Sequence, residues 1–321
     1  MQKVLRFIQN PYVIAIILLV FVVGSVFLYK YFQTLPRAAS EAQLHDVAYW
    51  KSRVQTASAA QAYQEAVWSV PQGSPLKVYH EIGHLVGSAI YDLKGLDAIT
   101  VCDPLTVFGC FHEIVRLYMR DHETKDLGPL AQRCDELLGY QISWMCKHAI
   151  GHGLILQNGK TLEALAKSLH QCDSVSTLDY TESCHAGVFM EYDYDMSDPG
   201  DLENARPLDD QNIYSPCFDV EGKYFEQCIR RRPYWWVIAL DEIPQAERYL
   251  RMMQLCRDPR IQGKTRTECM DAVALQMVLY EDKNEDFSKR CEDITRNDEE
   301  KAICENGVRL AVDMLLPQNR Y

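Results

Sequence analysis

The twelve cysteines of this 321-residue chain constrain its fold more than any other feature. Taken in order they form six couples with seven to twelve residues between the partners, and the couples recur at intervals of 32 to 45 residues. This is the period of helical-hairpin repeats. The couples are Cys102 with Cys110, Cys134 with Cys146, Cys172 with Cys184, Cys217 with Cys228, Cys256 with Cys269, and Cys291 with Cys304.

The segments around the couples have helical character. Apolar residues at helical spacing, as in 161–170, lead to the first cysteine of a couple, and the second cysteine opens another such stretch, as at Cys269. We therefore predict an all-α fold of solenoid-like helical hairpins, each cross-linked at its turn by its own disulfide. A further hairpin without a disulfide is expected at the N-terminal end, where Val78 occupies the cysteine position.

The regular, even set of cysteines predicts an oxidising compartment. Reduced cysteines in a cytosolic core are the alternative, and the regular pairing disfavours it. Closing loops this short stabilises a fold by about 2 to 3 kcal/mol per disulfide. The domain that carries the cysteines is therefore expected outside the cytoplasm.

An uncharged apolar run precedes the cysteines, from Tyr12 to Tyr29. A helix of this length spans about 27 Å, close to the hydrocarbon thickness of a bilayer. We predict a short cytoplasmic segment at 1–11, a single-pass transmembrane anchor in the cell membrane at 12–32, and a helical stalk at 33–70. The repeat domain at 71–321 would then be periplasmic or extracellular. A cleaved signal peptide is the alternative, although its apolar stretch would be shorter.

Disulfide-linked hairpins of this period resemble Sel1-like repeats, a branch of the tetratricopeptide superfamily. The resemblance covers Cys102 to Cys304 and rests on the period and on the use of cysteine. Most couples here have longer gaps than those of that family. Solenoids of this kind present a concave surface to protein partners.

Six of the nine histidines recur at related places after a cysteine or its substitute: His80, His84, His112, His148, His152 and His185. The pattern His-x-x-Gly-His occurs twice, at 80–84 and at 148–152. On a helix this spacing puts both imidazoles on one face, where they can share a metal ion. Equivalent residues of stacked hairpins lie side by side, so we predict that the six histidines form one metal centre.

Three carboxylates accompany these histidines. Each of them can be a ligand, a base or a group that orients a ligand. Glu113 and Glu191 are taken first as candidate ligands, and Glu81 as the candidate general base. Zinc is the default ion for a histidine-rich site without thiolates, while iron, copper or a haem held by two histidines stay open. The alternative is that the histidines only form hydrogen bonds at helix ends.

The segment His80-Glu81-Ile-Gly-His84 also resembles the His-Glu-x-x-His motif of the zincin metallopeptidases. The resemblance implies that both histidines bind zinc and that Glu81 activates water. It covers five residues, and the second pair has Ala149 where the first has Glu81. The unit that the two pairs share is therefore His-x-x-Gly-His, which is not the zincin motif.

The sequence favours a membrane-anchored, extracytoplasmic metal-binding protein, with a metal-dependent hydrolase of the cell envelope as the first enzymatic hypothesis. A protein-interaction scaffold without stoichiometric metal is the alternative, and a zinc peptidase is the second. A net charge of −12 argues against nucleic acid as a partner. The aromatic and basic segment 230–236 fits either a partner or lipid surface, or a proline-kinked core helix.

Overall fold

The chain is helical throughout the part that the computed structural model describes, which comprises residues 11–34, 37–122, 127–136, 140–174, 181–194, 206, 209, 211–281 and 285–315. These residues contain no β-strand, so the predicted all-α class is confirmed. The helices are α2 (Pro11–Thr34), α3 (Glu41–Leu44), α4 (Val47–Thr56), α5 (Ala59–Ser69), α6 (Leu76–Lys94), η1 (Gly95–Thr100), η2 (Pro104–Thr106), α7 (Gly109–Asp121), α8 (Gly128–Asp135), α9 (Tyr140–Asn158), α10 (Leu162–Asp173), α11 (Thr181–Asp193), α12 (Gly222–Ala239), α13 (Gln245–Cys256), α14 (Gly263–Tyr280), α15 (Phe287–Ile294) and α16 (Asp298–Leu315).

All six predicted disulfides are present, and each joins consecutive cysteines. Four of them join the first helix of a hairpin to the first or second turn of the next, in α8–α9, α10–α11, α13–α14 and α15–α16. The other two begin outside an α-helix, because Cys102 follows η1 and Cys217 lies in the turn before α12. Six disulfides indicate an oxidising, extracytoplasmic environment.

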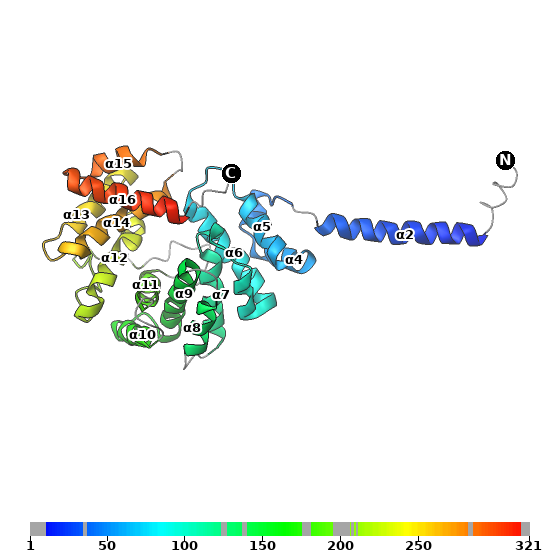
Figure 1. Cartoon of the computed structure of the whole chain (residues 1–321), viewed down its shortest axis with the longest axis horizontal. Coiled ribbons are helices and arrows are strands. Elements are labelled where there is room, and N and C mark those ends of the chain that lie inside the picture. Colours follow the sequence, from blue (N-terminus) through cyan, green and yellow to red (C-terminus); the bar gives the residue numbers. More distant parts are fainter. Residues whose placement is uncertain are drawn as a thin grey trace.

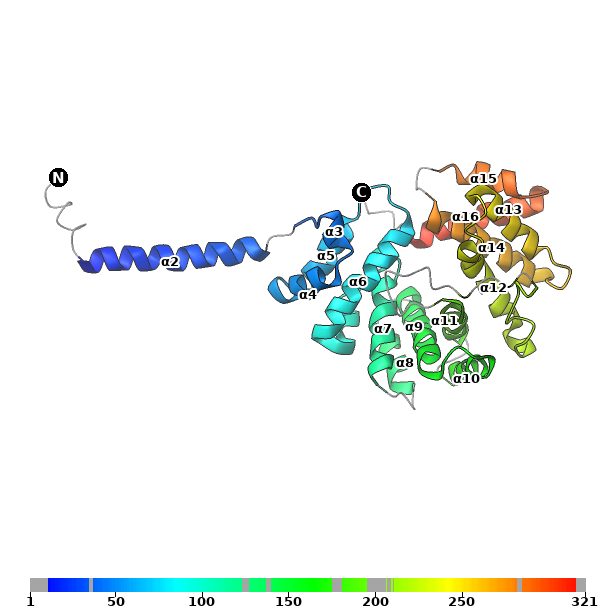
Figure 2. The ribbon, with the colours of Figure 1, turned by 180° about the vertical axis from the view of Figure 1, so that it is seen from behind.

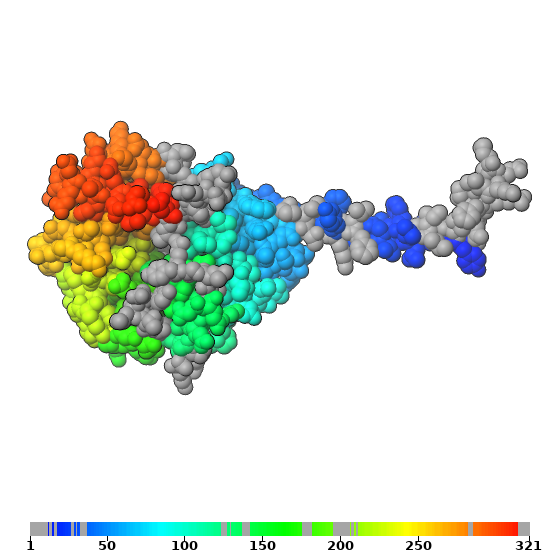
Figure 3. All heavy atoms as spheres, in the orientation of Figure 1, coloured from blue at the N-terminus to red at the C-terminus, as the bar shows by residue number. Residues whose placement is uncertain are grey.

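The longer helices form a curved stack, with α6, α7, α9, α11, α12, α14 and α16 each packed on the next (Figure 2). The curve returns on itself, because α14 also contacts α6. At that contact the ammonium of Lys77 lies 5.3 Å from the centre of the Tyr280 ring. In the space-filling view the first and second halves of the repeat domain form one continuous surface (Figure 3). The stack is therefore closed into a ring.

The segment predicted as a stalk is instead part of the folded body. Its helices α4 and α5 pack against α6 and bury Trp50 and Tyr63. Inside this small bundle Arg53 makes two hydrogen bonds of 2.6 Å to the buried Glu65. These residues are helical as predicted, but they pack on α6 and do not form a separate helical stalk, because the apolar positions of 47–69 supply a second hydrophobic face for α6.

Helix α2 projects away from this body (Figure 1). Large apolar side chains along it are exposed, such as Phe21 at 74% and Leu19 at 64%. Within the described part of the chain, however, no helix meets the combined demands of length and apolarity for crossing a membrane. The anchor at 12–32 therefore stays a prediction, and most of the predicted cytoplasmic segment at 1–11 lies outside the described residues.

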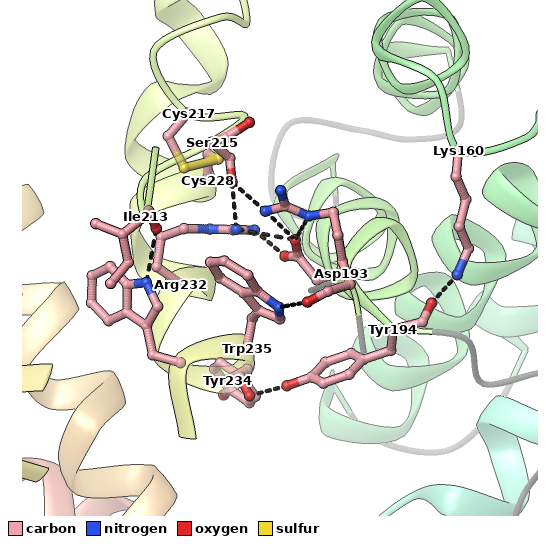
Figure 4. Close-up of polar contacts among 12 residues, drawn as sticks. Lys160, Asp193, Tyr194, Ile213, Ser215, Cys217, Cys228, Arg232, Tyr234 and Trp235 are labelled. Atoms are coloured by element: carbon pink, nitrogen blue, oxygen red, sulfur yellow. Dashed lines mark hydrogen bonds and ion pairs between the residues drawn. A yellow bond between two sulfur atoms is a disulfide. The ribbon is translucent and has the colours of Figure 1, made fainter. Parts of the chain in front are cut away.

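The basic and aromatic segment of α12 is a core segment. Trp235 and Trp236 are fully buried, and their indole nitrogens donate to the carbonyl oxygens of Arg206 and Ile213. Arg232 is also fully buried and forms an ion pair with Asp193, while its Nη1 donates to the carbonyl oxygen of Ser215 (Figure 4). The two tryptophan rings of this segment therefore pack inside the body and do not form a partner surface.

Candidate metal centre

Five of the six predicted histidines meet inside the ring. They form two groups of three that could each hold a metal ion: His80 with His84 and His112, and His112 with His148 and His152. In each group the candidate ligand atoms lie within 4.8 Å of one another. The histidines come from α6, α7 and α9, which pack side by side.

The first pair lies on α6. Nδ1 of His80 donates to the carbonyl oxygen of Val107 (2.8 Å), and Nδ1 of His84 donates to Oε2 of Glu113 (3.0 Å). Burial alone would raise the pKa of Glu113, but the hydrogen bond from His84 and the charge of Arg116 outweigh it and lower the pKa. The carboxylate is therefore ionised and accepts the proton of Nδ1. Both rings keep a lone pair on Nε2.

The second pair, on α9, repeats this arrangement. Nδ1 of His148 donates to the carbonyl oxygen of Ser183 (3.2 Å), and Nδ1 of His152 donates to Oε2 of Glu191 (3.0 Å). Glu191 is fully buried on α11. As in the first pair, one ring is oriented by a backbone carbonyl and the other by a buried carboxylate, so the lone pairs are again on Nε2.

Within each pair of histidines, the Nε2 lone pairs of the two rings face each other. The Nε2 atoms of His80 and His84 are 3.1 Å apart, and so are those of His148 and His152. A proton cannot easily relieve this contact, because burial and neighbouring imidazoles lower the pKa of His80 to about 3 and that of His148 well below its usual value. Two nitrogen ligands of one tetrahedral zinc ion lie about 3.3 Å apart. In each pair, therefore, the two rings can bind one metal cation between them.

His112 stands between the two pairs. Its ring centre is 5.2 Å from that of His80 and 6.0 Å from that of His84, and it is 5.0 Å from that of His148 and 5.2 Å from that of His152. Both of its nitrogens are buried without a hydrogen-bond partner. Leaving such atoms unpaired is costly, and coordination to a metal would satisfy them.

Glycines allow the helices to approach closely enough for this geometry. A Cβ atom on Gly109 would overlap the carbonyl oxygen of His80, and one on Gly187 would overlap that of His148. Each of these glycines is followed four residues later by the carboxylate that orients an imidazole, which is Glu113 in α7 and Glu191 in α11. The two halves of the centre are therefore a structural repeat, with α6 and α7 corresponding to α9 and α11.

This correspondence explains which predicted residues do not join the centre. His185 lies away from it, and its Nε2 is 3.0 Å from Oδ1 of Asp173. The prediction aligned Cys184 with Cys110, whereas the close contacts align α11 one helical turn later, so that Met190 corresponds to His112. His185 is therefore outside both groups of three, and this geometry does not support its predicted role as a ligand. Glu113 and Glu191 accept hydrogen bonds from His84 and His152, and neither belongs to the two groups of three.

A cavity of about 590 Å³ opens beside the centre. His80, His112 and His148 line one side of it, and residues of α12, α14 and α16 line the other. Glu81 also lines the cavity, and burial raises the pKa of its carboxyl group. Molecules that enter the cavity would thus reach both the histidines and this carboxyl group.

Comparisons of the chain with known protein families, with curated proteins and with solved structures found no match. The resemblances to Sel1-like repeats and to zincins therefore stay predictions. The evidence about function comes from the geometry of the five histidines and of the cavity beside them.

Proposed function

We propose that the protein binds transition-metal ions at the five histidines and acts on a small molecule in the adjacent cavity. The observation that carries the proposal is the pair of facing Nε2 atoms, found twice at 3.1 Å. Each Nδ1 is already committed to a carbonyl or a carboxylate, so a cation is the natural partner of the two lone pairs. Oriented imidazoles of this kind are the usual metal ligands of proteins.

The proposal includes two ions that share His112. The imidazole of His112 has two ring nitrogens, and neither has a hydrogen-bond partner. Each nitrogen can supply the third ligand of one of the two groups of three. A ring that binds two ions gives up its remaining proton, which the two positive charges favour. Three protein ligands per ion leave a fourth position for water or substrate, as in catalytic zinc sites rather than structural ones.

Zinc is the ion that we propose first, because it accepts three imidazoles in a tetrahedral site. Copper and iron also bind imidazole and are the alternatives. Haem fits poorly, because the facing nitrogens of each pair are too close together to hold the two faces of a porphyrin. The ligand set contains no thiolate, since all twelve cysteines are in disulfides.

Metal analysis of the purified chain tests the proposal. We expect about two ions per chain after reconstitution with zinc and dialysis against a weak chelator. His112→Ala should retain fewer than one, because both groups lose a ligand, whereas the control His185→Ala should retain two. A wild-type protein that takes up no stoichiometric zinc, copper or iron would contradict the proposal and favour the scaffold.

A metal-dependent hydrolase is the first enzymatic hypothesis. Glu81 lines the same cavity as His80 and can serve as a general base for water bound near the first pair. The second pair has Ala149 at the corresponding position, so a base of this kind would belong to one ion only. Hydrolysis that survives Glu81→Gln unchanged would exclude this role.

We also propose that α2 anchors the body to a membrane, with the disulfide-linked domain on the extracytoplasmic side. The support is the row of exposed apolar side chains on a helix that projects from the body. Such a surface is unfavourable in water and is stabilised in lipid. Protein partners of the ring surface stay a prediction from the repeat pattern.

A further inference from the structure

One buried cation in the cavity wall lacks an ion pair. Arg231 of α12 is 6% exposed, and its Nε has no hydrogen-bond partner. Among the described residues no carboxylate forms an ion pair with it, whereas the next residue, Arg232, is paired with Asp193. Burying a guanidinium without an ion pair is strongly unfavourable. Burial lowers the pKa of Arg231 and outweighs Tyr234 and the exposed Glu182, which favour its charged form. The stability of the fold therefore does not account for Arg231.

Arg231 lies beside the candidate metal centre. Its guanidinium carbon is 5.7 Å from the centre of the Trp144 ring and 4.9 Å from that of Tyr234. The Trp144 ring in turn stacks on the imidazole of His148, with centroids 5.4 Å apart and planes inclined by 14°. All four side chains line the same cavity. The cation is thus held in place by aromatic faces, and its position relative to His148 is fixed.

The rest of the lining restricts what the cavity can accept. Ile238, Leu275 and Leu279 provide apolar surface. The carboxyl groups in the lining are those of Glu81, Glu182, Glu268 and Asp271. A volume of about 590 Å³ is typical of sites for small molecules. Additional carboxyl groups disfavour a polyanion. The cavity therefore suits a molecule with one anionic group and an apolar body.

We propose that Arg231 anchors an oxyanion group, a carboxylate or a phosphoryl group, of a small amphiphilic substrate, and that it holds this group next to the histidine centre. The planar guanidinium matches such groups through two parallel hydrogen bonds. The apolar body would lie along α12 and α14. The contact of the substrate with a metal ion rests on the proposed function, but the anchoring by Arg231 does not.

The test is calorimetric titration of the purified full chain with benzoate and with phenyl phosphate, in zinc-loaded and in chelator-treated protein. Wild-type protein should bind at least one probe, and Arg231→Gln should weaken that binding about 10- to 100-fold, as expected for loss of hydrogen bonds to a charged group. The matched control is Arg230→Gln, which removes a charge from the neighbouring, less buried arginine of the same cavity and should change affinity less than about threefold.

Metal content and Tm are measured on every variant. If Arg231→Gln lowers Tm, Arg231→Lys replaces it, with a smaller loss of affinity expected because the charge remains. Absence of binding of both probes to the wild type, or equal binding by Arg231→Gln and the wild type, overturns the proposal. The two proposals can fail separately. If the wild type takes up no zinc but Arg231→Gln still weakens probe binding to the chelator-treated protein, the metal centre is rejected and the oxyanion anchor is supported.

Discussion

At the scale of single residues, the centre is defined by what holds each Nδ1. A carbonyl or a buried carboxylate accepts the proton there, so Nε2 is the only ring atom left to bind an ion. Such partners orient metal-binding histidines in general. The carboxylates are therefore as much a part of the centre as the rings.

Glu191 allows this role to be tested, because His152 is its hydrogen-bond partner and no arginine pairs with it among the described residues. Glu191→Gln removes the charge that favours the oriented ring, so zinc affinity should fall about tenfold or more. Glu81→Gln is the control and should leave zinc affinity unchanged, since Glu81 orients neither pair. Competition with a fluorescent zinc chelator measures both. Equal affinities in the two variants would show that Glu191 does not support the centre.

The buried imidazoles also predict how the metal-free protein responds to pH. Burial lowers the pKa values of His80, His112, His148 and His152, so the unfolded chain binds more protons than the folded chain as the pH falls below about 6.5. Stability is then lost as the pH falls, by up to about 1.4 kcal/mol per pH unit for each such group. Urea unfolding of chelator-treated protein between pH 7 and pH 5 measures this. Zinc at saturating concentration should reduce the slope.

The sequence indicated which histidines lie close together better than it indicated how their neighbours orient them. The spacing within His-x-x-Gly-His correctly indicated two pairs on helical faces, because helix geometry is a local property. The place of His185 depends instead on how far one helix is shifted along its neighbour, which no local pattern records. For the same reason the sequence left open whether Glu113 and Glu191 bind an ion or orient a histidine, and their distances to His84 and His152 favour the orienting role.

At the scale of helices, the centre depends on close crossing of α6 with α7 and of α9 with α11. The glycines at these crossings let a carbonyl oxygen of one helix touch the backbone of the other. The order of the cysteines predicted all the disulfides correctly, since each loop is short and closes on itself. It did not predict the register between hairpins, which is set by these glycine contacts.

Gly187→Ala tests the importance of the crossing. Its Cβ would overlap the carbonyl oxygen of His148, so α9 and α11 must move apart, at a cost of about 1 to 3 kcal/mol in the free energy of unfolding. Zinc content should fall as well, because His152 would lose contact with Glu191. The matched control is Gly222→Ala, where the added Cβ meets nothing within 4 Å. Stability and zinc content like those of the control would show that the close crossing is not required.

At the scale of the whole molecule, the body is a closed ring with a projecting helix. The repeat period indicated a stack of hairpins, but closure of the stack depends on the contact between α14 and α6, which are far apart in the chain. The stalk prediction failed at the same scale. Its residues are helical as expected, and tertiary packing on α6 makes them part of the body.

The membrane role of α2 can be tested with charges. Arginine near the middle of a membrane helix costs about 2.5 to 3.5 kcal/mol per residue. The double variant Leu19→Arg and Val23→Arg should therefore shift the chain from the membrane to the soluble fraction in a flotation experiment. Tyr31→Arg, near the end of α2, is the control and should remain with the membrane. Flotation of the double variant like that of the wild type would contradict the anchor.

Ring closure also builds the cavity from two walls that can change independently during evolution. The candidate metal ligands come from α6, α7 and α9, and the opposite wall of the cavity comes from α12, α14 and α16. Mutations in the opposite wall can alter which molecule is accepted without disturbing a single ligand. Related chains that keep the histidines and differ at Arg231 would then be expected to have diverged in substrate while retaining the same inorganic chemistry.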